Sequence, residues 1–171
     1  MINDEVVNKV IEAVHKSLNY NAYNSTIAQQ NTNCYSHAIG STVHCNKEVY
    51  RIGTISGKNV DEYYFTQEEL KALFLSDLAR LKLDVEELNI TKTQLIGDEI
   101  NYLDNNQHIV VLFAQQRKKD DIIREFHFLR YDNENGWTEK RWGYKPFAVN
   151  VSTSWPDYWP NVQIGIFRIS R

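Results

Sequence analysis

The sequence contains few cysteines, which excludes one common way of stabilising a small protein. Cys34 and Cys45 are the two cysteines among 171 residues. A chain of this length buries a sufficient core without covalent cross-links, and two cysteines are too few for a disulfide framework. A reducing cytosol also argues against a disulfide between them. We therefore expect at least one of these cysteines to be present for its chemistry.

Long apolar segments and clusters of positive charge are also missing. No stretch approaches the ~20 consecutive apolar residues that a membrane-spanning helix requires. The net charge is −3, and the basic run at residues 117–119 is followed directly by Asp120 and Asp121. Binding to nucleic acid requires clustered Lys and Arg side chains that displace counterions. We therefore expect neither a membrane span nor a nucleic-acid partner.

The first residues lack the features of an ordinary secretion signal. Residues 1–5 read Met-Ile-Asn-Asp-Glu, without a basic start or an apolar stretch after it. We expect synthesis in a cytoplasm. The sequence leaves open whether the protein stays there or is exported by a dedicated secretion system.

The remaining composition is that of an ordinary globular protein, with 42% apolar and 24% charged residues. Length predicts a single domain over residues 1–171. Helical spacing or capping residues occur over residues 3–19, from Cys34 to about Gly40, and from Thr66 onward, where Glu69 completes a capping box. Strand-like runs cover residues 109–113, 125–131, 137–142 and 162–169, with a turn at 132–136. Helices first and antiparallel strands second predict an α+β fold, in which N-terminal helices pack on an antiparallel sheet.

Three segments give weaker signals. Residues 20–33 are rich in Asn, Gln, Ser and Thr, and we expect a loop there. Residues 44–65 look irregular, and the stretch 84–106 predicts only some helix and a polar loop. In the strand at 125–131, alternation predicts that His127 and Phe128 face opposite sides of the sheet.

Cys34 and His127 form a candidate nucleophile and base. A thiol attacks carbonyl carbon as its thiolate, which is favoured by the positive end of a helix or by a nearby imidazolium. Cys34 stands where a polar loop turns into a predicted helix, and His127 lies in a predicted strand that would hold its ring rigidly. A cysteine at a helix start and a histidine from a sheet are the layout of papain-like enzymes.

Two short segments carry a resemblance to a known family. The residues Asn-Cys-Tyr-Ser-His-Ala at 33–38 resemble an "NCY-x-x-A" nucleophile motif. The segments Glu-Phe-His-Phe-Leu-Arg at 125–130 and Trp-Thr-Glu-Lys at 137–140 resemble a "YHWYR…WSHK" pair of strands. Both motifs are typical of bacterial and phage proteins similar to NlpC-type peptidoglycan peptidases. The resemblance implies a papain-like fold and a Cys–His catalytic pair at Cys34 and His127.

The same resemblance implies a third residue that orients the imidazole. In NlpC-type enzymes it follows the histidine by about twelve residues, on the next strand. Glu139 lies twelve residues after His127, where the family usually has histidine. A carboxylate can also accept a hydrogen bond from the far ring nitrogen. A β-bulge at Gly136 would move Glu139 away from His127, and Asp132 and Asp157 are then the alternatives.

The oxyanion of a tetrahedral intermediate requires hydrogen-bond donors beside the nucleophile. The backbone N–H of Cys34 is one such donor. Asn33, Gln29 and Gln30 lie just upstream, where papain-like folds place a second donor, and we favour Asn33 among them.

Other interpretations of these residues remain open. Cys34 could be an inert buried thiol, and His127 a core histidine among aromatic residues. Cys34, His37, His44 and Cys45 supply four zinc-type ligands, but the adjacent side chains at 44 and 45 fit a tetrahedral site poorly. We therefore expect no metal and no cofactor. His15 is expected at the surface, and His108 has no evident partner.

The function that we expect is a thiol-dependent hydrolase of an amide bond. The resemblance implies a peptidoglycan stem peptide as substrate, and a protein or another peptide would fit the same chemistry. Deamidation and acyl transfer would use the same residues and would differ from hydrolysis only in the nucleophile that attacks and the group that leaves. The family usually has histidine where this sequence has Glu139. This difference leaves a second hypothesis open, a catalytically silent papain-like module that binds a partner.

Overall fold

The computed structural model describes residues 3–16, 18–43, 51–58, 65–97, 102–116, 120–151 and 162–171. The helices are α1 (Asp4–Val14), the 3-10 helix η1 (Tyr20–Asn24), α2 (Thr26–Asn31), α3 (Cys34–Ile39), α4 (Gln67–Arg80) and α5 (Lys92–Gly97). The strands are β1 (Asp84–Glu87), β2 (Gln107–Gln116), β3 (Ile123–Asp132), β4 (Gly136–Glu139), β5 (Phe147–Ala148) and β6 (Val162–Ser170).

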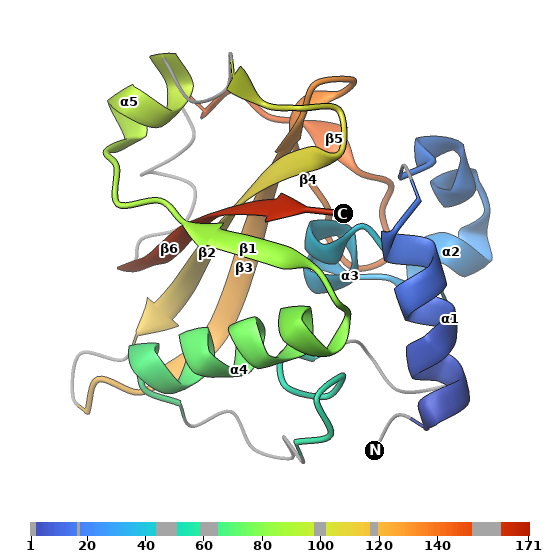
Figure 1. Ribbon diagram of the computed structural model, residues 1–171, viewed down its shortest axis with the longest axis horizontal. Coiled ribbons are helices and arrows are strands. Elements are labelled where there is room, and N and C mark those ends of the chain that lie inside the picture. The colour runs from blue at the N-terminus through green and yellow to red at the C-terminus, as the bar shows by residue number, and fades with distance from the viewer. Residues whose placement is uncertain are drawn as a thin grey trace.

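The six strands of the described residues form one sheet, in the order β1-β6-β2-β3-β4-β5. Every paired neighbour is antiparallel. Strand β2 lies inside the sheet between β6 and β3, which explains its nearly continuous apolar sequence. Helices precede most of the strands along the chain (Figure 1). The α+β prediction, with helices packed against an antiparallel sheet, is confirmed.

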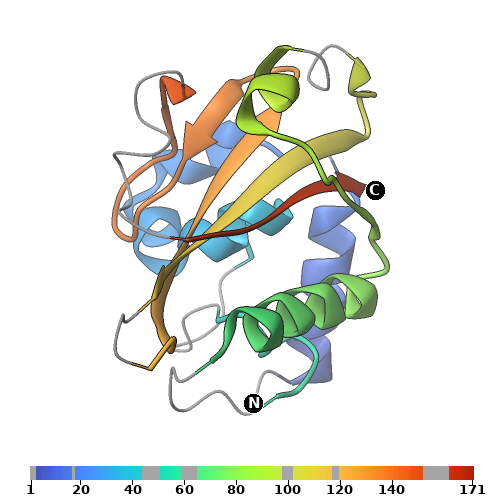
Figure 2. The same cartoon turned by 90° about the vertical axis from the view of Figure 1, so that its left-hand side faces the viewer.

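The two faces of the sheet carry separate groups of buried side chains. The first group joins α1, α3 and α4 to the sheet and includes Phe74, Phe128 and Phe167. The second joins α5 and its flanking residues to the opposite face and includes Leu95 and Leu129. Figures 1 and 2 show α1 and α4 close together and α5 apart from both. Phe128 and Leu129 therefore face opposite sides, as alternation predicts.

Helix α1 is shorter than predicted and ends at Val14 rather than near residue 19. Asn3 caps its start, because its side chain accepts a hydrogen bond from the backbone N–H of Val6. The ring of His15, just after the helix, donates from Nε2 to the carbonyl oxygen of Leu81 at 2.9 Å. His15 is exposed, as predicted, and its hydrogen bond also connects it to the end of α4.

Helix α4 begins with the predicted capping box. The Thr66 side chain accepts from the backbone of Glu69, whose carboxylate accepts from the backbone of Thr66. Further along the helix, the fully buried Asp77 accepts hydrogen bonds from Tyr35 Oη (2.5 Å), Gly53 N (2.6 Å) and Ser56 N (2.7 Å). One carboxylate thus joins α4 to α3 and to the turns of residues 51–58.

The predicted loop at residues 20–33 contains η1 and α2, so that prediction is wrong. Asn19 and Ser25 cap these two short helices with their side-chain oxygens. Polar residues that resemble a loop in sequence act here as helix caps. The stretch 84–106 adds β1 and α5. Within the described residues, no helix is long and apolar enough to cross a membrane.

Candidate active site

Cys34 is the first residue of α3, and its side chain is partly buried. Asn33 caps the helix, since its Oδ1 accepts from the backbone N–H of Ser36 at 3.0 Å. Ser36 Oγ in return accepts from the backbone N–H of Asn33 at 2.8 Å. The helix ends at Gly40, whose φ of 80° is the left-handed conformation that glycine adopts readily. The predicted helix from Cys34 to about Gly40 is confirmed.

The β3–β4 hairpin places His127 and Glu139 beside each other. Asp132 pairs with Gly136 next to the turn and Leu129 pairs with Glu139 at the far end, without a register shift between them. Glu139 is therefore the diagonal neighbour of His127 on the same face of the sheet. His127 Nε2 lies 3.4 Å from Glu139 Oε2, and Glu139 is fully buried. The displacement of Glu139 that a bulge would have caused does not occur.

The Cys34 side chain is hydrogen-bonded to His127, so the helix start and the sheet histidine meet. His127 itself is 7% exposed. The structure therefore forms a continuous row of side chains, Cys34–His127–Glu139, from three different elements. Residues that are far apart in sequence come together because α3 packs on β3.

The electrostatic surroundings of His127 favour its charged form. Burial alone would lower the pKa of the imidazole. The hydrogen bonds and negative charges of Cys34 and Glu139 outweigh burial and raise the pKa of His127 to about 9. At neutral pH the ring is therefore an imidazolium between two acidic groups.

Arg141 extends this row beyond Glu139. Its Nε donates to Glu139 Oε1 at 3.0 Å, while Glu139 Oε2 faces His127. The two carboxylate oxygens thus have separate cationic partners. The arrangement fixes the rotamer of Glu139 and directs one oxygen at the histidine ring.

Lys140 is a fully buried cation close to Cys34, which the sequence did not lead us to expect. Its Nζ donates to the carbonyl oxygens of Thr32 (2.7 Å), Arg141 (3.2 Å) and Gln29 (3.3 Å). Burial lowers the pKa of Lys140 to about 8, and negative charge at Cys34 opposes that change. The side chain ties β4 to the segment that leads into α3.

The residues considered for the oxyanion have different environments. Asn33 lies next to Cys34, and its Oδ1 is engaged as the helix cap. The side-chain amide of Gln29 donates to the carbonyl oxygen of Tyr23 at 2.9 Å. Gln29 is therefore committed to the fold of η1 and α2. Gln30 is exposed, and its carbonyl oxygen accepts from Trp142 Nε1 at 2.7 Å.

Of the alternatives for the third residue, Asp132 lies away from His127. It is five residues further along the same strand, which corresponds to roughly 16 Å. Its carboxylate instead contacts Arg130 Nε at 3.3 Å and Tyr20 Oη at 3.1 Å. The other alternative, Asp157, lies outside the described residues.

The zinc hypothesis receives no support from the half of its ligand set that is described. His37 is fully buried, and its Nε2 shares a hydrogen bond with Thr138 Oγ1 at 3.0 Å. His44 and Cys45 lie outside the described residues. Among the residues described, no group of three or more His, Cys, Asp or Glu side chains could hold a metal.

His108, expected to lack a partner, donates from Nε2 to the carbonyl oxygen of Ala38 at 2.9 Å.

No family model matches this sequence, and neither a curated protein nor a solved structure is significantly similar to it. The chemistry of the site therefore has to be argued from its own geometry. A cysteine at a helix start, an imidazolium and a buried carboxylate are the chemical groups that a thiol nucleophile, a proton carrier and an orienting residue require.

Proposed function

We propose that the protein is a thiol-dependent hydrolase of an amide bond, with a papain-like arrangement of helices and sheet. The observation that carries this proposal is the row Cys34–His127–Glu139, with His127 held between the thiol and a buried carboxylate. A core histidine without a catalytic role would be expected to stay neutral when buried. Here two acidic groups keep the ring charged instead.

In the proposed reaction, Cys34 Sγ attacks the carbonyl carbon of the amide as the thiolate. The negative charge moves to the carbonyl oxygen. The backbone N–H of Cys34 and the side-chain amide of Asn33 donate hydrogen bonds to this oxygen. The His127 imidazolium gives its proton to the leaving nitrogen as the C–N bond breaks. A thioester to Cys34 and a free amine result.

Water then completes the cycle. Neutral His127 takes a proton from the attacking water, the thioester C–S bond breaks, and the acid is released. Glu139 accepts a hydrogen bond from Nε2 throughout, which leaves Nδ1 as the ring nitrogen for proton transfer. Replacing water by another nucleophile gives acyl transfer, and a side-chain amide as substrate gives deamidation.

The substrate class that we propose is a peptide amide, including the stem peptide of peptidoglycan, on which enzymes of the resembling NlpC type act. The exposed side chains of Trp142 and Tyr144 come three and five residues after Glu139. Trp142 is anchored to α2, which leads into the nucleophile helix. These aromatic surfaces suit the binding of a peptide or a sugar ring.

The test is to detect the thioester. Purified protein is incubated with peptidoglycan fragments and with synthetic peptides, quenched with acid, and examined by intact and tandem mass spectrometry. We expect an acyl adduct on Cys34, release of an amine, and loss of both in Cys34→Ala and His127→Ala. Asp132→Asn is the control carboxylate variant and should keep its activity. Folded protein that binds a peptide without forming an adduct or cleaving it would favour a silent binding module instead.

A further inference from the structure

A second polar site lies at the C-terminal end of β3, beyond His127. A cavity of about 190 Å³ opens there, with a lining that includes Arg130, Asp132, Gln107 and Arg171. Cys34, His127 and Glu139 do not belong to its lining. The cavity is smaller than the roughly 300 Å³ at which pockets for drug-sized ligands begin. It therefore suits a small ion or the charged end of a small molecule.

Arg130 is the deepest charged group of this site, with 2% of its surface exposed. Its Nη1 donates to the carbonyl oxygens of His37 (3.2 Å) and Ala38 (3.1 Å). Its Nε donates to Asp132 at 3.3 Å. Within the described part of the chain, Nη2 has no hydrogen-bond acceptor. A guanidinium carries five N–H donors, so Arg130 retains donors for a ligand.

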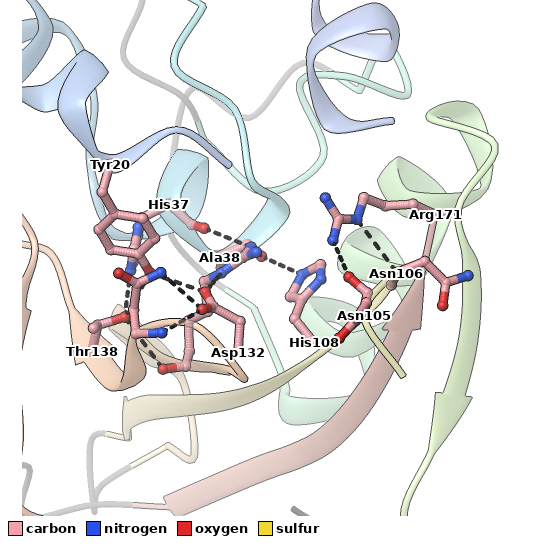
Figure 3. Close-up of polar contacts among 11 residues, drawn as sticks. Tyr20, His37, Ala38, Asn105, Asn106, His108, Asp132, Thr138 and Arg171 are labelled. Atoms are coloured by element: carbon pink, nitrogen blue, oxygen red, sulfur yellow. Dashed lines mark hydrogen bonds and ion pairs between the residues drawn. The ribbon is translucent and has the colours of Figure 1, made fainter. Parts of the chain in front are cut away.

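Arg171 approaches the same cavity from the end of β6 (Figure 3). Its Nη2 donates to the carbonyl oxygen of Asn105 at 2.8 Å, and its Nε donates to that of Asn106 at 3.3 Å. These contacts aim the guanidinium group and leave Nη1 without an acceptor among the described residues. Burial, followed by the positive charge of Arg130, lowers the pKa of Arg171. The two cations are thus close enough to repel each other.

Asp132 is the carboxylate that faces both arginines, and its oxygens are already occupied. Oδ2 accepts from Arg130 Nε and from Tyr20 Oη. Oδ1 accepts from the backbone and the side-chain amide of Asn135, each at 2.9 Å. Glu134, the other carboxylate of the lining, is exposed. The two guanidinium groups therefore face one partly buried carboxylate whose oxygens are engaged, and one exposed carboxylate.

The neighbouring histidines add no charge to the cavity. His37 and His108 are fully buried, and burial, followed by the charge of Arg130, lowers the pKa of each well below its usual value. Both rings are therefore neutral at physiological pH. Figure 3 shows His108 between Ala38 and the Asn105–Arg171 contact. The charged groups of the lining are therefore Arg130 and Arg171 with Asp132 and Glu134, and among these four Arg130 is the buried one.

We propose that this cavity binds a small oxyanion, a carboxylate or a phosphate group, between Arg130 and Arg171. Guanidinium N–H groups match the planar oxygens of a carboxylate and the oxygens of a phosphate. The ligand would accept hydrogen bonds from Arg130 Nη2 and Arg171 Nη1, which have no acceptor among the described residues. This site is independent of the chemistry proposed for Cys34.

The test is calorimetric titration of the purified protein at pH 7 with inorganic phosphate and, separately, with succinate. Ionic strength is held constant with sodium chloride. We expect saturable binding of at least one of these anions, and the comparison identifies the group that the site prefers. Arg171→Gln should weaken binding about tenfold or more. Glu134→Gln should strengthen it, because the exposed carboxylate at the cavity is removed.

Arg168→Gln is the matched control. Arg168 lies in β6 three residues before Arg171, pairs with Glu86 at 2.8 Å, and is not in the cavity lining. Its replacement should leave binding unchanged, and circular dichroism should show that all three variants are folded. The proposal is wrong if neither anion saturates the wild-type protein. It is also wrong if Arg171→Gln and Arg168→Gln weaken binding equally.

Discussion

Glu139 Oε2 lies 3.4 Å from His127 Nε2, and the two residues belong to neighbouring strands of one hairpin. In the proposed site, this contact would let a carboxylate take the orienting role that the resembling family usually gives to histidine. It leaves the other ring nitrogen for Cys34. The hairpin register, rather than local sequence, determines whether this contact forms.

Glu139→Gln should lower the pKa of His127. The substitution keeps the shape of the side chain but removes its charge, so the imidazolium loses one of its two anionic partners. We expect the pKa to fall from about 9 by about 1 to 3 units. Two-dimensional NMR of the ring nitrogens against pH measures this directly. A pKa unchanged by Glu139→Gln would show that Glu139 does not stabilise the imidazolium.

The same raised pKa predicts how stability depends on pH. A folded-state pKa of about 9 exceeds the unfolded value of about 6.5, so the folded protein binds the proton more tightly. The stabilisation by His127 is complete below pH 6.5 and is lost as the pH rises through 9. Urea unfolding of wild type and His127→Gln between pH 6 and 10 should therefore show a difference that shrinks with increasing pH.

Asp77→Ala should destabilise the protein by roughly 2 to 5 kcal/mol, because three donors would lose their acceptor in the core. Tyr35→Phe, which removes one of these hydrogen bonds, should cost less. Urea unfolding of both variants provides the measurement. Equal stability of Asp77→Ala and wild type would mean that the buried carboxylate does not hold residues 51–58 in place.

Gly40 and Gly57 form a matched pair, since both have φ of 80°. A Cβ at Gly57 would meet no atom of the described residues within 4 Å, whereas one at Gly40 would lie 3.2 Å from Arg130 Nη1. Gly57→Ala should cost about 1 to 2 kcal/mol for left-handed strain alone. Gly40→Ala should cost more, because it also displaces Arg130. Similar thermal shifts for the two variants would contradict a tight contact at Gly40.

Trp142→Ala should impair substrate binding more than the chemistry. The side chain is 65% exposed and donates one hydrogen bond to Gln30, so its loss should change the free energy of unfolding little. We expect a higher KM with nearly unchanged kcat, once a peptide substrate is in hand. An unchanged KM would remove Trp142 from the proposed substrate surface.

Much of the fold follows from the sequence because its periodicity is strong. The apolar run of β2, the alternation along β3 and the turn before Gly136 locate three strands correctly. The capping boxes at Thr66 and Asn33 are each formed by residues close together in the sequence. Sequence spacing therefore predicts the capping box at Thr66 and the start of the helix at Cys34. The short helices η1 and α2 were missed because caps and loops use the same polar residues.

The candidate site was only partly predictable. Cys34, His127 and Glu139 were found because their motif and spacing are regular, and the structure brings them together. The burial of Lys140 was missed because a lysine is rarely fully buried, even within a predicted strand. Its burial depends on carbonyl groups of a segment about a hundred residues earlier. The cavity of Arg130 and Arg171 likewise joins strand ends that no sequence pattern relates.

The most direct test of the central claim is the rate of iodoacetamide alkylation at Cys34 against pH. Wild type and His127→Ala are compared in a Cys45→Ser background, with Asp132→Asn as the control. We expect wild type and Asp132→Asn to react rapidly well below pH 8.5, the usual pKa of a free thiol. In His127→Ala, the Cys34 thiol should lose this reactivity and follow the pH profile of an ordinary thiol. If Cys34 follows the pH profile of a free thiol, or if His127→Ala changes nothing, then the Cys34–His127 pair is not a catalytic one.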